Sequence, residues 1–132
     1  MKVTTKELIK KAEEAKEKAY APYSKFDVGA AIETESGKVY TGCNVENSSF
    51  GLSMCAERVA IFKAVSDGET KFKRIAIVAN TKGPVSPCGA CRQVMAEFGN
   101  FEVILANDSG DVEHTDVKAL LPGSFDLRRD SN

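Results

Sequence analysis

The sequence predicts a single α/β domain, spanning residues 1–132, built on a mixed sheet of five strands whose last strand is antiparallel. Two observations support this prediction. Segments with helical periodicity alternate with short apolar runs typical of strands, and turn residues separate most of them. In addition, a chain of 132 residues with 42% hydrophobic and 28% charged residues has the size and composition of one globular domain.

The first expected element is an amphipathic helix over residues 5–20. Its apolar residues recur at helical spacing, and Thr4 and Glu7 have the spacing of a capping box at its start. Pro22 is expected to end the helix, because proline cannot continue the backbone hydrogen bonds.

A β-hairpin is expected next. Residues 26–32 alternate between apolar and polar side chains, and residues 39–45 form a second run of this kind. The residues between them, Glu35-Ser36-Gly37-Lys38, are typical of a tight turn, so the two strands should be antiparallel neighbours.

Helix and strand alternate through the middle of the chain. Strands are expected over residues 74–80 and 101–106, and each follows a helix that begins at a cysteine motif. A strand that follows a helix in this way is typical of an α/β domain.

The C-terminal part should add a fifth strand over residues 112–115. Only the turn 107–110 precedes it, and a parallel connection needs a dozen or more residues, so this strand must be antiparallel. A short helix capped by Thr115 or Asp116 is expected to follow, and residues 126–132 are expected to be frayed.

Two cysteine motifs open the two central helices. Cys55 begins a C-A-E motif, and Cys88 and Cys91 belong to the motif P-C-G-A-C, which places them one helical turn apart. Thiolates are soft ligands suited to zinc, and two helix N-termini directed at one ion would help to keep three thiols deprotonated. The sequence therefore predicts a zinc site formed by Cys55, Cys88 and Cys91.

Two arginines are expected to adjust the charge of this site. Zinc with three thiolates carries a formal charge of about −1, which would make a bound water less acidic. Arg58 stands one helical turn after Cys55, and Arg92 directly follows Cys91. We expect at least one guanidinium to donate a hydrogen bond to a ligand sulfur.

A purely structural zinc site is the alternative, with Cys43 as a fourth ligand. Two observations oppose it. Cys43 lies beside Gly42 in a strand pattern, where a small buried thiol is the commoner role, and a structural site would have no use for Glu57. The only histidine, His114, lies in the segment of the fifth strand and is not expected to be a ligand.

Together, these motifs resemble the small homotetrameric, zinc-dependent cytidine deaminases. The C-A-E and P-C-x-x-C pair, the run Y-A-P-Y-S-K-F-D-V-G-A-A, the segment G-C-N-V-E-N and the terminal L-L-P-G-S-F extend over residues 19–125. The resemblance implies a three-layer α-β-α domain with one Zn²⁺ per chain. It also implies that a zinc-activated water converts cytidine and 2′-deoxycytidine to uridine and 2′-deoxyuridine plus ammonia, in pyrimidine salvage.

The resemblance implies roles for individual side chains. Glu57 would carry a proton from the water to ring nitrogen N3 and then to the departing amine. Asn44 and Glu46 would bind the ribose, chiefly its 3′-hydroxyl, and Phe26 would stack on the pyrimidine. The residues alone leave alternatives open: Asn44 and Glu46 alternate on an expected strand whose face could be solvated, and Phe26 could belong to the core.

Further contacts are implied around the base and between subunits. Backbone groups near Ala56, Ser86 and Cys88 would read the edge of the base, and Phe50 and Phe125 would line the pockets of neighbouring subunits. The family often has tyrosine where Phe50 stands, so a hydroxyl group is missing here.

Charge and composition exclude several other classes of protein. The formal net charge is −1 with both signs interspersed, so no nucleic-acid partner is expected and a small, weakly charged substrate fits better. The first residues contain no apolar run long enough for a signal peptide or a membrane span, and the cysteines lack the framework of a small secreted protein. A cytoplasmic protein with no membrane partner is expected.

Three alternative functions remain. A nucleic-acid-editing deaminase would need a basic groove. In addition, side chains that bind a free 3′-hydroxyl would collide with the 3′-phosphate of a nucleic-acid substrate. A non-catalytic, zinc-stabilised binding module would share the cysteines. A deaminase of an aminonucleoside antibiotic would share the zinc motif but should not need the complete N-V-E segment.

Overall fold

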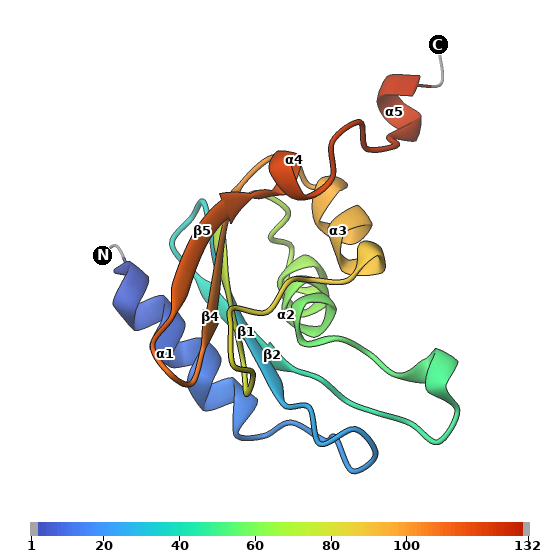
Figure 1. The fold of residues 1–132 in the computed structure, drawn as a ribbon. Helices are drawn as coiled ribbons and strands as arrows, with labels where there is room; N and C mark the ends of the chain where they lie inside the picture. Colours follow the sequence, from blue (N-terminus) through green and yellow to red (C-terminus); the bar gives the residue numbers. More distant parts are fainter. Residues whose placement is uncertain (1–2, 131–132) are drawn as a thin grey trace.

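Five strands form one mixed sheet in the order β2-β1-β3-β4-β5 (Figure 1). The computed structural model describes residues 3–130. The strands are β1 (Val28–Thr34), β2 (Val39–Cys43), β3 (Phe72–Ala79), β4 (Glu102–Asn107) and β5 (Val112–Asp116).

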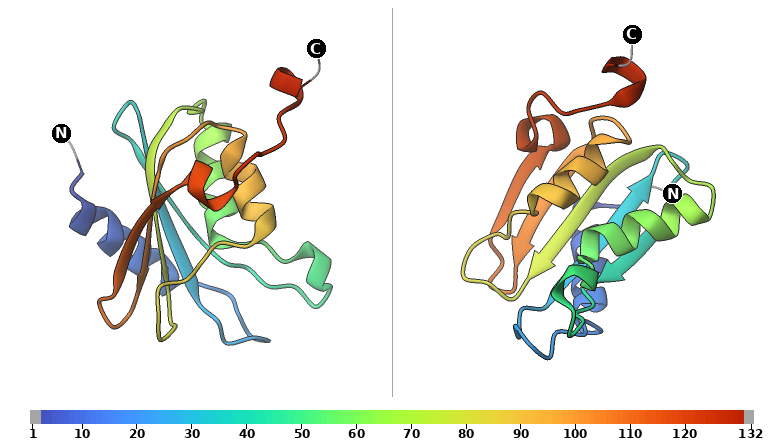
Figure 2. Two further views of the ribbon diagram at one scale, coloured as in Figure 1. Left: turned by 45° about the horizontal axis from the view of Figure 1, so that its top comes forward. Right: turned by 90° about the vertical axis from the view of Figure 1, so that its right-hand side faces the viewer.

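Helices cover both faces of this sheet, which gives the three layers that were expected. One helix, α1, lies on one face, and α2 and α3 lie together on the other (Figure 2). The helices are α1 (Thr5–Lys16), the short 3₁₀-helix η1 (Phe50–Leu52), α2 (Ala56–Ser66), α3 (Gly89–Ala96), α4 (Val117–Leu120) and α5 (Leu127–Asp130).

The strand pairing confirms the predicted topology. Strand β1 pairs antiparallel with both β2 and β3, and β3 and β4 are parallel because α3 crosses between them. Strand β5 returns antiparallel to β4 and forms one edge of the sheet, as the short turn before it requires.

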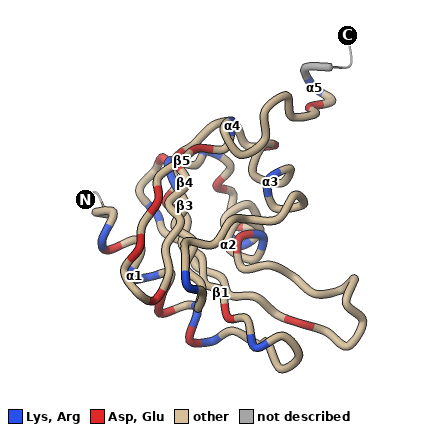
Figure 3. Tube along the Cα trace, viewed as in Figure 1, with Lys and Arg blue, Asp and Glu red and all other residues tan. Residues whose placement is uncertain are grey.

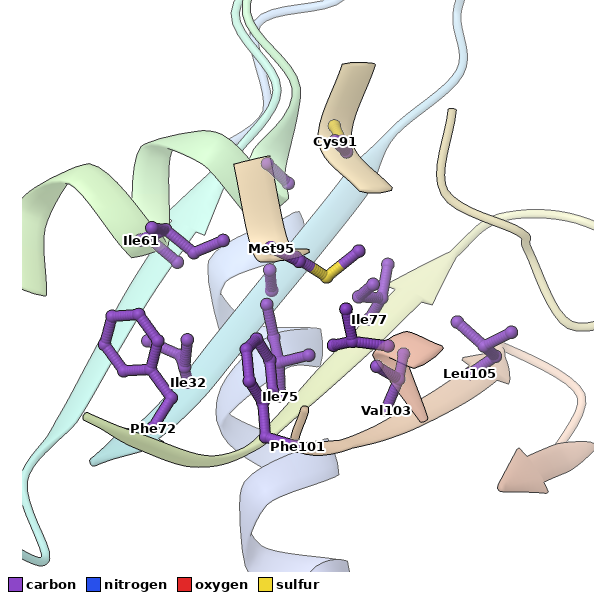
Figure 4. Close-up of a cluster of buried hydrophobic side chains, with 14 of the residues drawn as sticks. Ile32, Ile61, Phe72, Ile75, Ile77, Cys91, Met95, Phe101, Val103 and Leu105 are labelled. Carbon is purple, nitrogen blue, oxygen red and sulfur yellow. The ribbon is translucent and has the colours of Figure 1, made fainter. Parts of the chain in front are cut away.

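The larger hydrophobic core lies between the sheet and the pair α2 and α3. In Figure 4, Met95 and Cys91 of α3 lie on the same side of the sheet as Ile61 of α2, above Ile77 and Val103 of the central strands. Cys91 has no exposed surface, so the packing of α3 fixes the position of this thiol.

Two glycines let helices approach the sheet closely. A Cβ atom on Gly42 would lie 2.6 Å from the backbone nitrogen of Ala60 and 2.7 Å from the carbonyl oxygen of Ala56. A Cβ atom on Gly29 would lie 2.0 Å from the carbonyl oxygen of Ala12. Only glycine permits these approaches, and Gly42 thereby sets the distance between β2 and the helix that begins next to Cys55.

The capping box at the start of α1 is confirmed, but the predicted extent of this helix is wrong. It ends at Lys16, whereas the apolar pattern predicted a helix to Tyr20. The backbone nitrogen of Tyr20 instead donates to the carbonyl oxygen of Asn44 (2.9 Å), and the nitrogen of Glu46 donates to the carbonyl oxygen of Tyr20 (2.8 Å). This long-range pairing competes with the last helical turn and prevails over local propensity.

Two further expectations about local structure need correction. The second strand ends at Cys43 rather than at residue 45, so Asn44 and Glu46 do not lie on a regular strand. The chain end was expected to be frayed, but Leu127–Asp130 forms α5, which projects from the body (Figure 1). Residues 131–132 lie outside the described residues.

The charged residues do not divide into blocks. Figure 3 shows Lys and Arg interspersed with Asp and Glu along the trace. Within residues 3–130, no helix is both long enough and apolar enough to cross a membrane.

Candidate metal centre and active site

Both cysteine motifs lie at helix starts, as predicted. Cys55 is the N-cap residue of α2 and Cys88 is the N-cap residue of α3, and Cys91 follows in the first turn of α3. The N-terminus of a helix carries a partial positive charge, which favours the thiolate form of a nearby cysteine. Two helix N-termini therefore converge on the same group of sulfur atoms.

The three sulfur atoms have the spacing of a zinc site. The Sγ atoms of Cys55 and Cys88 are 3.8 Å apart, those of Cys88 and Cys91 are 3.5 Å apart, and all three lie within 4.8 Å of one another. A tetrahedral zinc ion with Zn–S bonds of about 2.3 Å requires its sulfur ligands to be about 3.8 Å apart. The side chains present thus fit zinc without rearrangement of the helices.

The thiols influence one another before any metal binds. A hydrogen bond from the Cys91 thiol lowers the pKa of Cys55 to about 5, and the Arg58 guanidinium lowers it further despite the partial burial of the sulfur. The same interaction with Cys55, together with burial, raises the pKa of Cys91. The surroundings of Cys55 therefore favour its thiolate form.

Glu57 is a buried carboxyl group next to the sulfur cluster. Its side chain comes from the first turn of α2, and the residue is only 4% exposed. Burial raises its pKa, and the negative charge of Cys55 raises it further. A carboxyl group with a raised pKa can both accept and release a proton near neutral pH.

The two arginines make different contacts. The Nη2 atom of Arg58 donates to the Sγ of Cys55 at 3.4 Å. Arg92 instead donates from Nε to the carbonyl oxygen of Pro87 (2.8 Å), from Nη1 to that of Leu120 (2.8 Å), and from Nη2 to the hydroxyl of Ser86. Of the pair, Arg58 contacts a cysteine sulfur, whereas Arg92 ties α3 to the segment before it and to α4.

A cavity of about 250 Å³ opens beside Glu57 and two of the cysteines. This volume is slightly below that of most small-molecule sites, which span about 300–1,000 Å³. The lining residues are Phe26, Val28, Asn44, Glu46, Ser53, Met54, Cys55, Ala56, Glu57, Val85, Ser86 and Cys88. The structure thus brings together Phe26, Asn44, Glu46, Ala56 and Glu57, which the sequence analysis singled out from three separate segments.

Two predicted pocket residues lie elsewhere in the chain. Phe50 is 77% exposed on the segment that carries η1, and Phe125 is 59% exposed between α4 and α5. Neither lines the cavity of its own chain. Their predicted role concerns the cavity of another subunit and stays a prediction.

Two other singled-out residues are separate from the site. Cys43 is half-buried rather than fully buried, and its Sγ donates to the carbonyl oxygen of Lys18 at 3.4 Å. It is not part of the sulfur cluster found in the described residues. His114 pairs with Glu102 across strands β4 and β5 at 2.9 Å.

The sequence analysis did not predict several apolar and polar residues that line the cavity. Val28, Ser53, Met54 and Val85 line it without having been named. Met54 and Ser53 directly precede the C-A-E motif, so their place in the chain was a usable signal. Val85 lies on an irregular segment before the second motif, where no periodicity indicates which side chains point inward.

Comparisons with known proteins agree with this geometry. A family model described as the cytidine and deoxycytidylate deaminase zinc-binding region matches residues 2–107. The chain is 59% identical over 120 residues to a cytidine deaminase of Sporosarcina psychrophila, covering 89% of this chain and 88% of that protein. It is 54% identical to a cytidine deaminase of Halalkalibacterium halodurans, covering 89% and 91%. The crystal structure of a cytidine deaminase from Burkholderia pseudomallei has a TM-score of 0.90 and 55% identity, covering 92% of this chain and 99% of that one.

Proposed function

The chain belongs to the cytidine and deoxycytidylate deaminase family and is a hydrolase, and from this premise we propose that it converts cytidine and water to uridine and ammonia. We extend the proposal to 2′-deoxycytidine and to a role in pyrimidine salvage. The observation that carries it is the arrangement of one cavity, whose wall combines a buried carboxyl group, Glu57, with the sulfur cluster.

Cys55, Cys88 and Cys91 would hold one zinc ion per chain. When bound, zinc supplies a water acidic enough to serve as a nucleophile near neutral pH. Arg58 offsets the negative charge of the thiolates through its hydrogen bond to Cys55. The N-termini of α2 and α3 add positive potential at the same place.

Glu57 moves the protons of the reaction. Its carboxylate takes a proton from the attacking water and delivers it to N3 of the pyrimidine, which makes carbon 4 more electrophilic. It then protonates the departing amino group, which leaves as ammonia. The low exposure of Glu57 excludes bulk water from this transfer, and general acid–base catalysis of this kind contributes about 10²- to 10⁴-fold in rate.

Substrate binding would use other residues that line the same cavity. Phe26 is 38% exposed and offers an aromatic face to the pyrimidine ring. Asn44 and Glu46 would receive the ribose, and backbone groups near Ala56, Ser86 and Cys88 would contact the edge of the base. No lysine or arginine lines the cavity in the described residues, which favours a neutral nucleoside over a nucleotide.

We also propose that the enzyme is a homotetramer with shared active sites. Phe50 and Leu52 on one projecting segment, and Phe125 and Leu127 on the C-terminal one, expose large apolar side chains. Apolar groups gathered on projecting segments favour self-association. Light scattering during size-exclusion chromatography should then give four times the 14.2 kDa of one chain. A cytoplasmic location stays a prediction.

One assay tests the proposed function. Purified protein is analysed for zinc and then mixed with cytidine, 2′-deoxycytidine or single-stranded DNA while absorbance and released ammonia are followed. We expect one zinc per chain and turnover of both nucleosides but not of DNA. Zinc without turnover would support a binding module, and turnover of DNA would support the editing class.

A further inference from the structure

The loop that carries Phe26 is strained. Lys25, which directly precedes it, has φ +61°, in the left-handed region that side-chain-bearing residues rarely adopt. Phe26 itself belongs to neither hydrophobic core cluster, so core packing does not hold its ring. The orientation of Phe26 therefore depends on the groups that fix the backbone around it.

Asn80 fixes one side of this loop. Its Nδ2 donates to the carbonyl oxygen of Lys25 at 3.1 Å, and its Oδ1 accepts from the backbone nitrogen of Asp27 at 3.1 Å. Asn80 does not line the cavity, and it reaches Phe26 only through the residues on either side of it.

Asn44 fixes the other side. Its Nδ2 donates to the carbonyl oxygen of Phe26 at 2.7 Å, and its Oδ1 accepts from the backbone nitrogen of Val28 at 2.9 Å. Asn44 is 8% exposed and lines the cavity. A side chain proposed to bind the ribose thus also holds the residue proposed to stack on the base.

Ser24 makes a second link of this kind, from Glu46 to Phe26. The hydroxyl of Ser24 donates to Oε2 of Glu46 and accepts from the backbone nitrogen of Phe26 at 3.0 Å. The Oε1 atom of Glu46 accepts from the backbone nitrogens of Tyr23 and Ser24, each at 3.1 Å. These contacts lower the pKa of Glu46, the Ser24 hydroxyl most of all, so the side chain is a charged acceptor at neutral pH.

One acceptor position of Glu46 remains for a substrate. A carboxylate offers about four lone-pair positions, and Tyr23 and Ser24 occupy three of them. A ribose hydroxyl that donates to the fourth would extend a chain of hydrogen bonds running from the sugar through Glu46 and Ser24 to Phe26. Because the Ser24 hydroxyl accepts from Phe26 while it donates to Glu46, these two hydrogen bonds strengthen each other and tie the position of the Glu46 carboxylate to that of the Phe26 backbone.

We propose that Ser24 is a positioning residue that couples the binding of the ribose by Glu46 to the orientation of the Phe26 ring against the base. The inference rests on the proposed function, which assigns Glu46 to the sugar and Phe26 to the pyrimidine. Ser24 lies outside the cavity beside Glu57 and acts only through its two partners.

The test compares two substrates, cytidine and 2′,3′-dideoxycytidine, which lacks the 2′- and 3′-hydroxyls of the sugar. Ser24→Ala keeps the backbone nitrogen that donates to Glu46 and removes only the linking hydroxyl. We expect KM for cytidine to increase about tenfold and KM for 2′,3′-dideoxycytidine about threefold or less, with kcat within about twofold of wild type for both. Ser24→Thr, which keeps a hydroxyl, should restore KM.

Asn80→Ala is the matched control. It loosens the same loop without touching Glu46, so it should raise KM by the same factor for both substrates, and thermal unfolding of each variant checks the fold. If Ser24→Ala raised KM by the same factor for both substrates, or left KM for cytidine unchanged, the coupling would be refuted and the proposed function would stand. A wild-type protein that deaminates neither substrate would overturn the proposed function and this inference with it.

Discussion

The Nη2 atom of Arg58 lies 3.4 Å from the Sγ of Cys55, which precedes it by one helical turn at the start of α2. A permanent positive charge is thereby held against one of the three sulfurs proposed to bind zinc. Its electrostatic effect extends to any water that the site activates.

Arg58→Gln is expected to shift the acidic limb of the pH–rate profile to higher pH. Without the guanidinium, the thiolates donate more charge, the activated water becomes less acidic, and more alkaline solution is needed for the same rate. A charged hydrogen bond is worth about 1.5–3 kcal/mol, and part of this corresponds to a shift of about one pH unit. The profile is measured from kcat/KM between about pH 5 and 9.

Arg92→Gln is the control for this profile, because Arg92 contacts Pro87, Leu120 and Ser86 but no sulfur. We expect it to lower stability and leave the acidic limb in place. An unchanged profile with full activity in Arg58→Gln would remove Arg58 from the mechanism.

Glu57→Gln is expected to keep the fold and the zinc but to lower kcat by about 10²- to 10⁴-fold, since glutamine has nearly the same shape and cannot carry a proton. Steady-state kinetics with cytidine, together with zinc analysis of the same sample, provide the measurement. Turnover within about tenfold of wild type would refute the role of Glu57.

The metal-free form of the same variant should differ in its pH dependence. Burial raises the pKa of Glu57 above the 4.5 of an unfolded chain, so the folded protein binds the extra proton and loses stability as pH increases beyond that value. Metal-free Glu57→Gln should therefore be more stable than metal-free wild type at pH 8, with a smaller difference near pH 4.5. Urea unfolding in the presence of a chelator checks this, and a difference that does not depend on pH would contradict it.

Cys88→Ala is expected to release zinc and destabilise the protein, whereas Cys43→Ser should leave about one zinc per chain. Cys88 belongs to the sulfur cluster, while Cys43 donates to the carbonyl oxygen of Lys18. Elemental analysis of both purified variants distinguishes these outcomes. If loss of Cys43 empties the site, a four-cysteine structural centre is favoured, because catalytic zinc keeps one position for water.

Gly42→Ala is expected to lower the free energy of unfolding by about 1–3 kcal/mol, because the added methyl group meets the backbone of α2 at Ala56 and Ala60. Displacement of α2 should also lower activity, since Glu57 lies in its first turn. Chemical denaturation and kinetics of the variant are the measurements. Gly83→Ala is the control, since no atom lies within 4 Å of its added Cβ; equal losses in the two variants would argue against the packing explanation.

The features of the fold and of the site that were best predicted from the sequence are those that depend on short segments of the chain. The clustering of the three cysteine sulfurs follows from two local motifs at helix starts, and the antiparallel fifth strand follows from the length of one turn. By contrast, the ends of α1 and β2 depend on the bridges that Val45 makes with Tyr20 and Met54, which no local pattern indicates. The left-handed conformation of Lys25 could not be predicted either, since the side chain of Asn80, 55 residues later in the chain, donates a hydrogen bond to its carbonyl oxygen.

Cys55 and Cys88 are 33 residues apart in the chain, and α2 and β3 lie between them. An ion held by both would therefore also act as a cross-link that closes a long loop in the unfolded polypeptide. A covalent cross-link over such a loop restricts the disordered chain enough to stabilise the native state by about 3–4 kcal/mol. Removal of the ion should consequently expose α3 and the end of β3 to hydrogen exchange well before the hairpin of β1 and β2, which lies outside the loop.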